Sequence, residues 1–172
     1  MSGLIALAVS IGMLAVIAIW LALGPLAAFN IQIWQFFFAW ACFYHCGGKT
    51  EGVQKTVPCM VFGAVDGMLS VLLIGQLGVL GALAAPVAVG MGAAAIVLAA
   101  HVGVLATIPA SVYGFASVAG LILLKGLSPV DAILPTIASI VMGAAFGWVS
   151  EQLAGKLTKV TVAPVSTTAP VR

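Results

Sequence analysis

The chain has 172 residues, of which 63% are hydrophobic and 6% are charged, and its formal net charge is +2. Soluble domains carry about 25% charged residues, so this composition excludes a water-soluble globular protein and indicates lipid surroundings. The small net charge and the lack of a basic tract argue against a nucleic-acid partner.

Six apolar segments are candidate transmembrane helices, since a spanning helix needs about 20 apolar residues. They cover residues 4–23, 31–46, 57–74, 80–102, 107–124 and 130–153. The first ends at Gly24-Pro25 and has no basic residue before it, so we interpret it as a retained helix rather than a signal peptide. The second is short and aromatic, which suggests a tilted, buried or partly re-entrant path. The sequence thus predicts an all-α, polytopic membrane bundle of six transmembrane helices.

The segments between these helices carry most of the charges. Residues 49–56 are predicted as a charged loop, with Pro58 in the first turn of the third helix, where proline is tolerated. Ser128 is a candidate N-cap of the sixth helix. We expect residues 1–154 to form a transmembrane helical domain and residues 155–172 to form a short, largely disordered cytoplasmic tail.

The positions of the basic residues predict the orientation in the membrane. With six spans and both termini in the cytoplasm, five of the six basic residues lie inside and only Lys125 lies outside, as the positive-inside rule expects. Five spans would place the two basic clusters on opposite sides of the membrane. The five residues expected inside are Lys49, Lys55, Lys156, Lys159 and Arg172.

The two halves of the chain share a weak similarity. Residues 36–49, followed by Pro58 and a glycine-spaced helix, resemble residues 112–125, followed by Pro135 and another such helix. The lysines that end these segments are 76 residues apart, and the two prolines are 77 apart. Two three-helix units in one chain would form a 3+3 inverted repeat, as in many transporters. Chance similarity is the alternative, because the identities are few.

Small residues at a spacing of four predict close helix packing in two of the spans. Gly63 and Gly67 form such a pair in the third helix, and Gly143 and Gly147 form one in the sixth. These pairs serve packing within one chain or contact between copies in a homo-oligomer, and neither role requires catalysis.

Two ionisable residues fall within or beside the apolar segments. Asp66 lies in the middle of the third span, where a charge costs about 2.5–3.5 kcal/mol. It is a candidate for a proton relay, a cation site or an interhelical hydrogen bond, and a structural, protonated or paired Asp is the alternative. His101, at the end of the fourth helix, can titrate or contact a solute. The preferred interpretation is that His101 caps the C-terminus of that helix.

Cys42, His45 and Cys46 share one helix face, because they are spaced at i, i+3 and i+4. Together with Cys59 they could hold a soft metal. The favoured interpretation is buried, apolar cysteines beside an interfacial histidine, so no metal and no cofactor are predicted. The sequence contains no motif of a known catalytic site, so an enzyme is not expected.

The aromatic residues of the second helix either line a narrow pore or form an interfacial belt. The charged residues that follow this helix are most simply exposed to solvent. The candidates for a solute path or its mouth are Trp40, His45, Lys49, Glu51, Asp66, His101 and Tyr113.

Two segments carry a family resemblance. Residues 40–52 (WACFYHCGGKTEG), followed by Lys55-Thr56, resemble the family called domain of unknown function 1097, and residues 108–117 (IPASVYGFAS) also look like a signature of that family. The resemblance covers about residues 4 to 153 and implies a multi-pass protein of the bacterial inner membrane. It implies no activity.

The leading functional hypothesis is a channel or transporter for a small neutral solute. A structural or regulatory membrane subunit without transport is the rival, and metal- or thiol-dependent chemistry is a third possibility. A continuous polar path past Asp66, Tyr113 and His101 would favour transport, whereas a sealed interface of Gly and Ala would favour the subunit.

Overall fold

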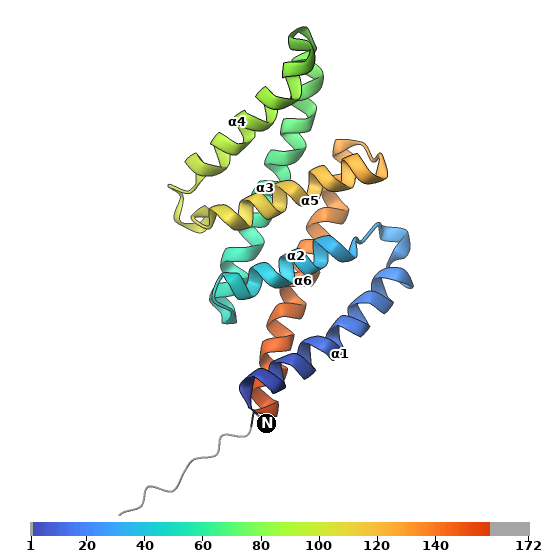
Figure 1. Cartoon of the computed structure of the whole chain (residues 1–172), viewed down its shortest axis with the longest axis vertical. Helices are drawn as coiled ribbons and strands as arrows, with labels where there is room; N and C mark the ends of the chain where they lie inside the picture. The colour runs from blue at the N-terminus through green and yellow to red at the C-terminus, as the bar shows by residue number, and fades with distance from the viewer. Residues whose placement is uncertain (1, 159–172) are drawn as a thin grey trace, which may run out of the picture.

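The protein is all α-helical in its computed structural model, which describes residues 2–158 (Figure 1). Short 3₁₀ turns connect several of the helices, and the described residues contain no strand. The predicted all-α helical membrane bundle is therefore confirmed. The helices are α1 (Gly3–Leu23), α2 (Ile33–His45), α3 (Lys49–Gln76), α4 (Ala84–Ala99), α5 (Ile108–Lys125) and α6 (Pro129–Leu157).

Five helical segments are long and apolar enough to cross a membrane, with α4 counted together with the 3₁₀ segment before it (Gly78–Ala99), and α2 is the exception. Its 13 residues make a helix of about 20 Å, which is shorter than a hydrocarbon core of about 30 Å. Six of those residues are buried in the bundle. The expected short second helix is therefore a protein-covered helix near the centre of the molecule.

The turns between the helices alternate between two ends of the bundle. The start of α1, the α2–α3 turn, the α4–α5 turn and the end of α6 lie toward the lower left of Figure 1. The other three turns lie toward its upper right. We call these the Lys49 end and the Lys125 end, after a residue in one turn of each. Both ends of the described chain thus lie on one side, as six passes through the bundle require.

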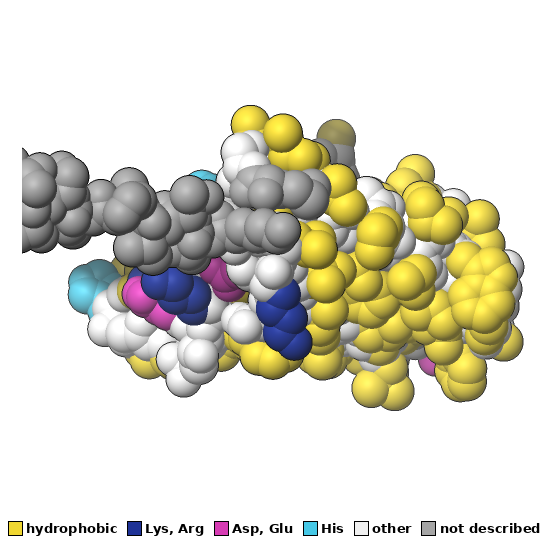
Figure 2. Space-filling model, turned by 90° about the horizontal axis from the view of Figure 1, so that it is seen from below, with side chains coloured by type: hydrophobic (Ala, Val, Ile, Leu, Met, Phe, Trp, Pro, Cys, Tyr) yellow, Lys and Arg dark blue, Asp and Glu magenta, His cyan; other side chains and the backbone are white. Residues whose placement is uncertain are grey.

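The charged side chains gather at the Lys49 end. Figure 2 views the molecule from below and shows most of the visible basic and acidic side chains together on one part of the surface, while hydrophobic side chains predominate on another part. The backbone amide of Lys49 donates to Glu151 Oε2 at 2.6 Å, and Lys55 Nζ lies 2.6 Å from Glu51 Oε1. The α2–α3 turn and the end of α6 therefore share one polar surface.

The predicted loop over residues 49–56 is wrong, because α3 begins at Lys49. Gly47 and Gly48 have positive φ values of 96° and 68°, so they reverse the chain within two residues and leave no need for a loop. Pro58 consequently lies inside α3 rather than in its first turn. The helix continues through it because the carbonyl that loses a partner belongs to Gln54, which is exposed and open to solvent.

The ends of other helices also differ from prediction. The fourth helix was expected over 80–102, but a 3₁₀ segment occupies Gly78–Leu83, where Gly81 has a φ of 53° and interrupts the helix. Helix α6 continues to Leu157, past the expected end at 153 and into the predicted tail. Ser128 caps α6 as predicted, accepting a hydrogen bond from the Asp131 amide at 3.1 Å. The rest of the predicted tail lies outside the described residues.

The two halves of the chain are built alike. Helix α3 packs against α4, α5 and α6, and α6 packs correspondingly against α1, α2 and α3. In Figure 1 a half-turn about the line of sight carries α1, α2 and α3 onto α4, α5 and α6 with the helix directions preserved. The matched helices therefore run in opposite directions through the bundle. This is the arrangement of an inverted repeat.

The burial pattern gives the residue correspondence between the halves. Eight residues of α3 are buried, and each lies 80 residues before a buried residue of α6, from Gly52 and Ala132 to Ser70 and Ser150. In α2 and α5 the corresponding separation is 75, as for Phe36 and Ser111. The pairing of Lys49 with Lys125 and of Pro58 with Pro135 is therefore out of register, although the repeat itself is present. Those residues are not equivalent, because their separations of 76 and 77 match neither 75 nor 80.

Candidate functional site at the interface between the halves

Glycines bring the helices of the two halves into backbone contact. A Cβ atom on Gly63 of α3 would overlap the carbonyl of Ser111 on α5, and one on Gly143 of α6 would overlap the carbonyl of Phe36 on α2. These two crossings are equivalent under the repeat. The helix backbones of the two halves are consequently close together. Small changes in side-chain volume at this interface therefore alter what can fit between the halves.

A buried polar cluster lies at this interface and joins three helices. Gln35 of α2 donates through Nε2 to the Ser117 carbonyl of α5 at 2.8 Å and to Thr136 Oγ1 of α6 at 3.1 Å. All three residues are fully buried. Gln35 Oε1 and Ser117 Oγ have no hydrogen-bond partner in the structure. A buried polar atom without a partner costs about 1–3 kcal/mol, so this cluster has unused capacity for a polar molecule.

A second, weaker polar cluster occupies the equivalent place nearer the Lys49 end. Thr56 of α3 corresponds to Thr136, and Cys42 of α2 corresponds to Ser117. Thr56 Oγ1 donates to Cys42 Sγ at 3.6 Å, and Cys42 Sγ lies 3.8 Å from Cys46 Sγ. The repeat thus places a pair of small polar or sulfur side chains on each side of the molecular centre.

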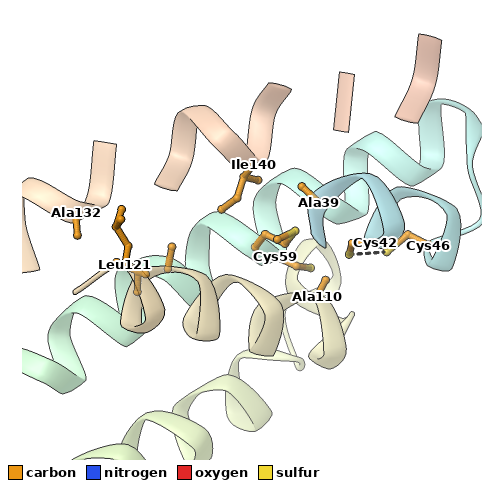
Figure 3. Close-up of a cluster of buried hydrophobic side chains, with 11 residues drawn as sticks. Ala39, Cys42, Cys46, Cys59, Ala110, Leu121, Ala132 and Ile140 are labelled. Carbon is orange, nitrogen blue, oxygen red and sulfur yellow. Dashed lines mark hydrogen bonds between the residues drawn. The ribbon is translucent and has the colours of Figure 1, made fainter. Parts of the chain in front are cut away.

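Apolar side chains fill the space around the centre. Met60 of α3 and Ile140 of α6 are equivalent, fully buried and members of the same hydrophobic cluster. Figure 3 shows Ile140 and Ala39 above Cys59, with Cys42 and Cys46 to one side and Leu121 to the other. We define Met60 and Ile140 as the central pair. No charged side chain is buried in the described part of this interface.

Trp40, a predicted path residue, belongs to a hydrogen-bond network on the other side of α2. Its Nε1 donates to Ser150 Oγ at 3.0 Å, and the Tyr44 hydroxyl lies 2.6 Å from the same oxygen. Ser150 Oγ in turn donates to the Gly147 carbonyl, and Ser10 of α1 donates to the Ser150 carbonyl at 2.5 Å. The network ties α1, α2 and α6 together.

His45 and Tyr113 are brought together by the fold. Their ring centroids are 6.5 Å apart in an edge-to-face arrangement, and with Phe38 and Ala41 they line a surface pocket of about 260 Å³. His45 is exposed and Tyr113 is half-buried. This pocket thus brings together two predicted path residues from different helices.

The remaining predicted path residues lie apart from that pocket. Lys49 and Glu51 are exposed at the start of α3, where the amide of Lys49 is bonded to Glu151 and Glu51 is paired with Lys55. His101 is exposed, and its Nδ1 lies 3.0 Å from the Leu98 carbonyl, the contact expected of a helix cap. The seven predicted residues therefore do not form one continuous path in this structure.

Asp66 occupies a separate position between α3 and α4. It is half-buried, and its Oδ2 is buried without a hydrogen-bond partner. Helix α4 comes close to it at Gly92, where a Cβ atom would lie 3.1 Å from that oxygen. The equivalent residue of α6 is Phe146, which packs 4.9 Å from Phe36 between ring centroids. The first half of the repeat thus has a carboxyl group at the position where the second half has an aromatic ring.

The four residues considered for a metal do not converge. Cys59 Sγ donates to the Val104 carbonyl at 3.4 Å, while Cys42 and Cys46 face each other. Within residues 2–158 no three His, Cys, Asp or Glu side chains come close enough to hold a metal ion. The three cysteines are buried and free.

A family model, described as "Protein of unknown function (DUF1097)", matches residues 8–155, which is most of the chain. The chain belongs to this family. Comparison with curated proteins and with solved structures returns no match. The match begins within α1 and ends within α6, so all six helices of the inverted repeat belong to the DUF1097 unit.

Sequence reasoning missed Gln35, Ser117 and Thr136 of this DUF1097 protein. Gln35 lies between Trp34 and Phe36, so an amide within an aromatic run of a membrane helix was the available signal. Ser117 and Thr136 give no such signal, because small hydroxyl residues are common in membrane helices and often bond within their own helix.

Proposed function

We propose that this protein is a channel or transporter for a small neutral polar solute, in the bacterial inner membrane with both termini in the cytoplasm. The observation that carries the proposal is the pair of unpartnered buried atoms, Gln35 Oε1 and Ser117 Oγ, at the interface of two inverted halves. Inverted repeats in membrane proteins commonly hold the transported substrate at this interface.

The chemistry of the interface favours a neutral solute. Its polar groups are an amide, hydroxyls and thiols, which exchange hydrogen bonds but do not compensate a full charge. A charged solute would have to leave its hydration shell with no opposite charge to meet it. A small molecule carrying both donors and acceptors would satisfy Gln35 Oε1 and Ser117 Oγ together.

The proposed path runs from the Gln35 cluster, past the central pair of Met60 and Ile140, to the cluster of Cys42 and Thr56. The side chains of the central pair fill the interface, so passage requires them to change rotamer or the halves to move. Alternating access by rocking of inverted halves supplies such a motion in other membrane proteins.

The test is solute flux into liposomes that hold the purified protein, measured by stopped-flow light scattering with water, glycerol and urea as probes. We expect flux of at least one probe above that of empty liposomes, and lower flux in Gln35→Leu. Gln54→Leu is the matched control, because Gln54 is exposed on α3. Absence of flux for every probe would overturn the proposal.

A structural or regulatory membrane subunit is the second candidate, and the backbone contacts at Gly63 and Gly143 favour it. At these two crossings the helices of the two halves are in direct contact in this structure. A subunit of this kind would show no flux and would co-purify from the membrane in a fixed ratio with another integral protein. Flux that Gln35→Leu abolishes would exclude this candidate.

A further inference from the structure

Asp66 stands out among the side chains that the proposed path does not use. It is the only charged residue between Lys55 and Lys125, and it lies near the middle of the 28-residue helix α3. No hydrogen bond or ion pair joins it to another group within residues 2–158. A carboxyl group in such a position is either neutralised or bound to a ligand, because an unpaired charge inside a membrane is costly.

The surroundings of Asp66 are tightly packed and provide one hydroxyl group, but no opposite charge. At Gly92 of α4, an added Cβ would overlap Ser70 Oγ and would lie 3.1 Å from Asp66 Oδ2 and 3.0 Å from Phe115 Cε2. Three side chains from α3 and α5 therefore pack directly against the backbone of α4 at Gly92, which has no side chain to hold them away. Ser70 is buried and lies one helical turn after Asp66.

The titratable groups on neighbouring helices do not neutralise Asp66. Helix α4 carries none, and Lys55 on α3 itself is paired with Glu51. The groups on the other helices packed against α3 make no hydrogen bond or ion pair with Asp66 in the described residues. They are Tyr113 and Lys125 of α5, Asp131, Glu151 and Lys156 of α6, and Cys42, Tyr44 and His45 of α2, with Cys46 and His101 in the adjoining turns.

An apolar pocket lies beside this place. It has a volume of about 260 Å³, lies between α4 and α5, and is lined only by hydrophobic residues. Phe115 lines this pocket and also packs against Gly92 next to Asp66. The carboxyl group is thus one aromatic ring away from a cavity that an apolar molecule can enter.

We propose that Asp66, with Ser70 and the close approach of α4 at Gly92, forms a proton-binding site between α3 and α4. The proton is the ligand that these observations fit, because it neutralises the carboxylate without the several oxygen ligands, and the room for them, that a metal cation demands. The acid form also gains a donor that can bond to a neighbouring oxygen.

The inverted repeat strengthens this assignment. Phe146 holds the equivalent position in α6, where it packs against Phe36 and Trp40. An aromatic ring satisfies packing at this position, so a carboxyl group is not required by the fold. A chemical role therefore explains the carboxyl group of Asp66 better than a packing role does.

The test is labelling of the purified protein in liposomes with dicyclohexylcarbodiimide, an apolar reagent that reacts with protonated carboxyl groups, followed by mass spectrometry. We expect one adduct on Asp66, abundant in mildly acidic buffer and several-fold weaker in alkaline buffer. Asp66→Asn should lose the adduct. Asp131→Asn is the control that should keep it, since Asp131 is exposed at the start of α6. A water-soluble carbodiimide on exposed carboxyls corrects for the pH dependence of the reagent.

Two further variants keep the test decisive if Asp66→Asn fails to fold. Gly92→Ala crowds Ser70 and Asp66 and should reduce labelling of an intact Asp66, whereas Gly90→Ala, which meets only open space, should not. No adduct on Asp66, or a yield independent of pH after correction, would overturn the proposal. Protection by sodium ions at constant pH would overturn it in favour of a cation site. Labelling is measured without solute flux, so failure of this proposal can be distinguished from failure of the proposed transport function.

Discussion

The carboxylate of Glu151, near the end of α6, accepts a hydrogen bond from the backbone amide of Lys49, the first residue of α3. The two residues are 102 positions apart in the chain, and their contact is 2.6 Å long. A negative group at a helix N-terminus satisfies an otherwise free amide and interacts favourably with the helix dipole. The start of α3 is thus capped from a distant helix.

Glu151→Ala should therefore destabilise the protein by about 0.5–2 kcal/mol, the usual effect of losing a helix cap. Thermal unfolding in detergent, followed by circular dichroism, measures the effect. Glu51→Ala is the comparison, because it removes an exposed acidic side chain that pairs with Lys55, and it should cost less than Glu151→Ala. An equal loss in both variants would contradict a capping role for Glu151.

Gly63→Ala and Gly143→Ala should each destabilise the protein by about 1–3 kcal/mol, as overpacking does in a filled core. Their methyl groups would overlap backbone carbonyls, which cannot turn away as side chains can. Gly12→Ala and Gly90→Ala are matched controls in other helices, since a Cβ at either position meets only open space. The same unfolding measurement distinguishes the pairs, and an unchanged Gly63→Ala would refute close packing at this crossing.

Ser150→Ala should cost about 1–3 kcal/mol, because it leaves the Trp40 indole N–H buried without an acceptor. Tyr44→Phe should cost less, since Ser150 Oγ then keeps its bonds to Trp40 and to Gly147. Unfolding by detergent titration, monitored by tryptophan fluorescence, compares the two variants. A larger loss in Tyr44→Phe would show that Ser150 does not organise the network.

Met60→Ala and Ile140→Ala test the proposed path. Each removes half of the central pair, and their equivalence under the repeat predicts similar increases in solute flux through liposomes. Leu124→Ala is the control, because Leu124 is 77% exposed on the outside of the bundle. Unchanged flux in both central variants, with intact folding, would place any solute path elsewhere.

Much of the architecture followed from hydropathy and from glycine and proline positions. The apolar runs located all six helices, and Gly24-Pro25 ended the first as expected. The charged segment after Gly48 was misjudged, because polar composition suggested a loop. The carboxylate that allows a helix to start there lies on α6, so its effect cannot be seen locally.

The candidate site was predictable only in part. The inverted repeat left a trace in the sequence, because the Gly63/Gly67 and Gly143/Gly147 pairs lie 80 residues apart, but the lysines and prolines used for the alignment were out of register and burial was needed to correct it. Asp66 was recognisable because a carboxyl group is rare in a membrane helix. The Gln35 cluster depends on three helices meeting, which no single segment encodes.

The inverted repeat has a consequence for the two faces of the membrane. Halves related by inversion present the same backbone to opposite leaflets, so any difference between the faces must come from residues that differ at equivalent positions. Gln35 matches Ala110, and Asp66 matches Phe146. A molecule arriving from one leaflet would meet an amide where one arriving from the other would meet a methyl group. Under the proposed transport function, directionality would arise from these few side chains on a symmetric backbone.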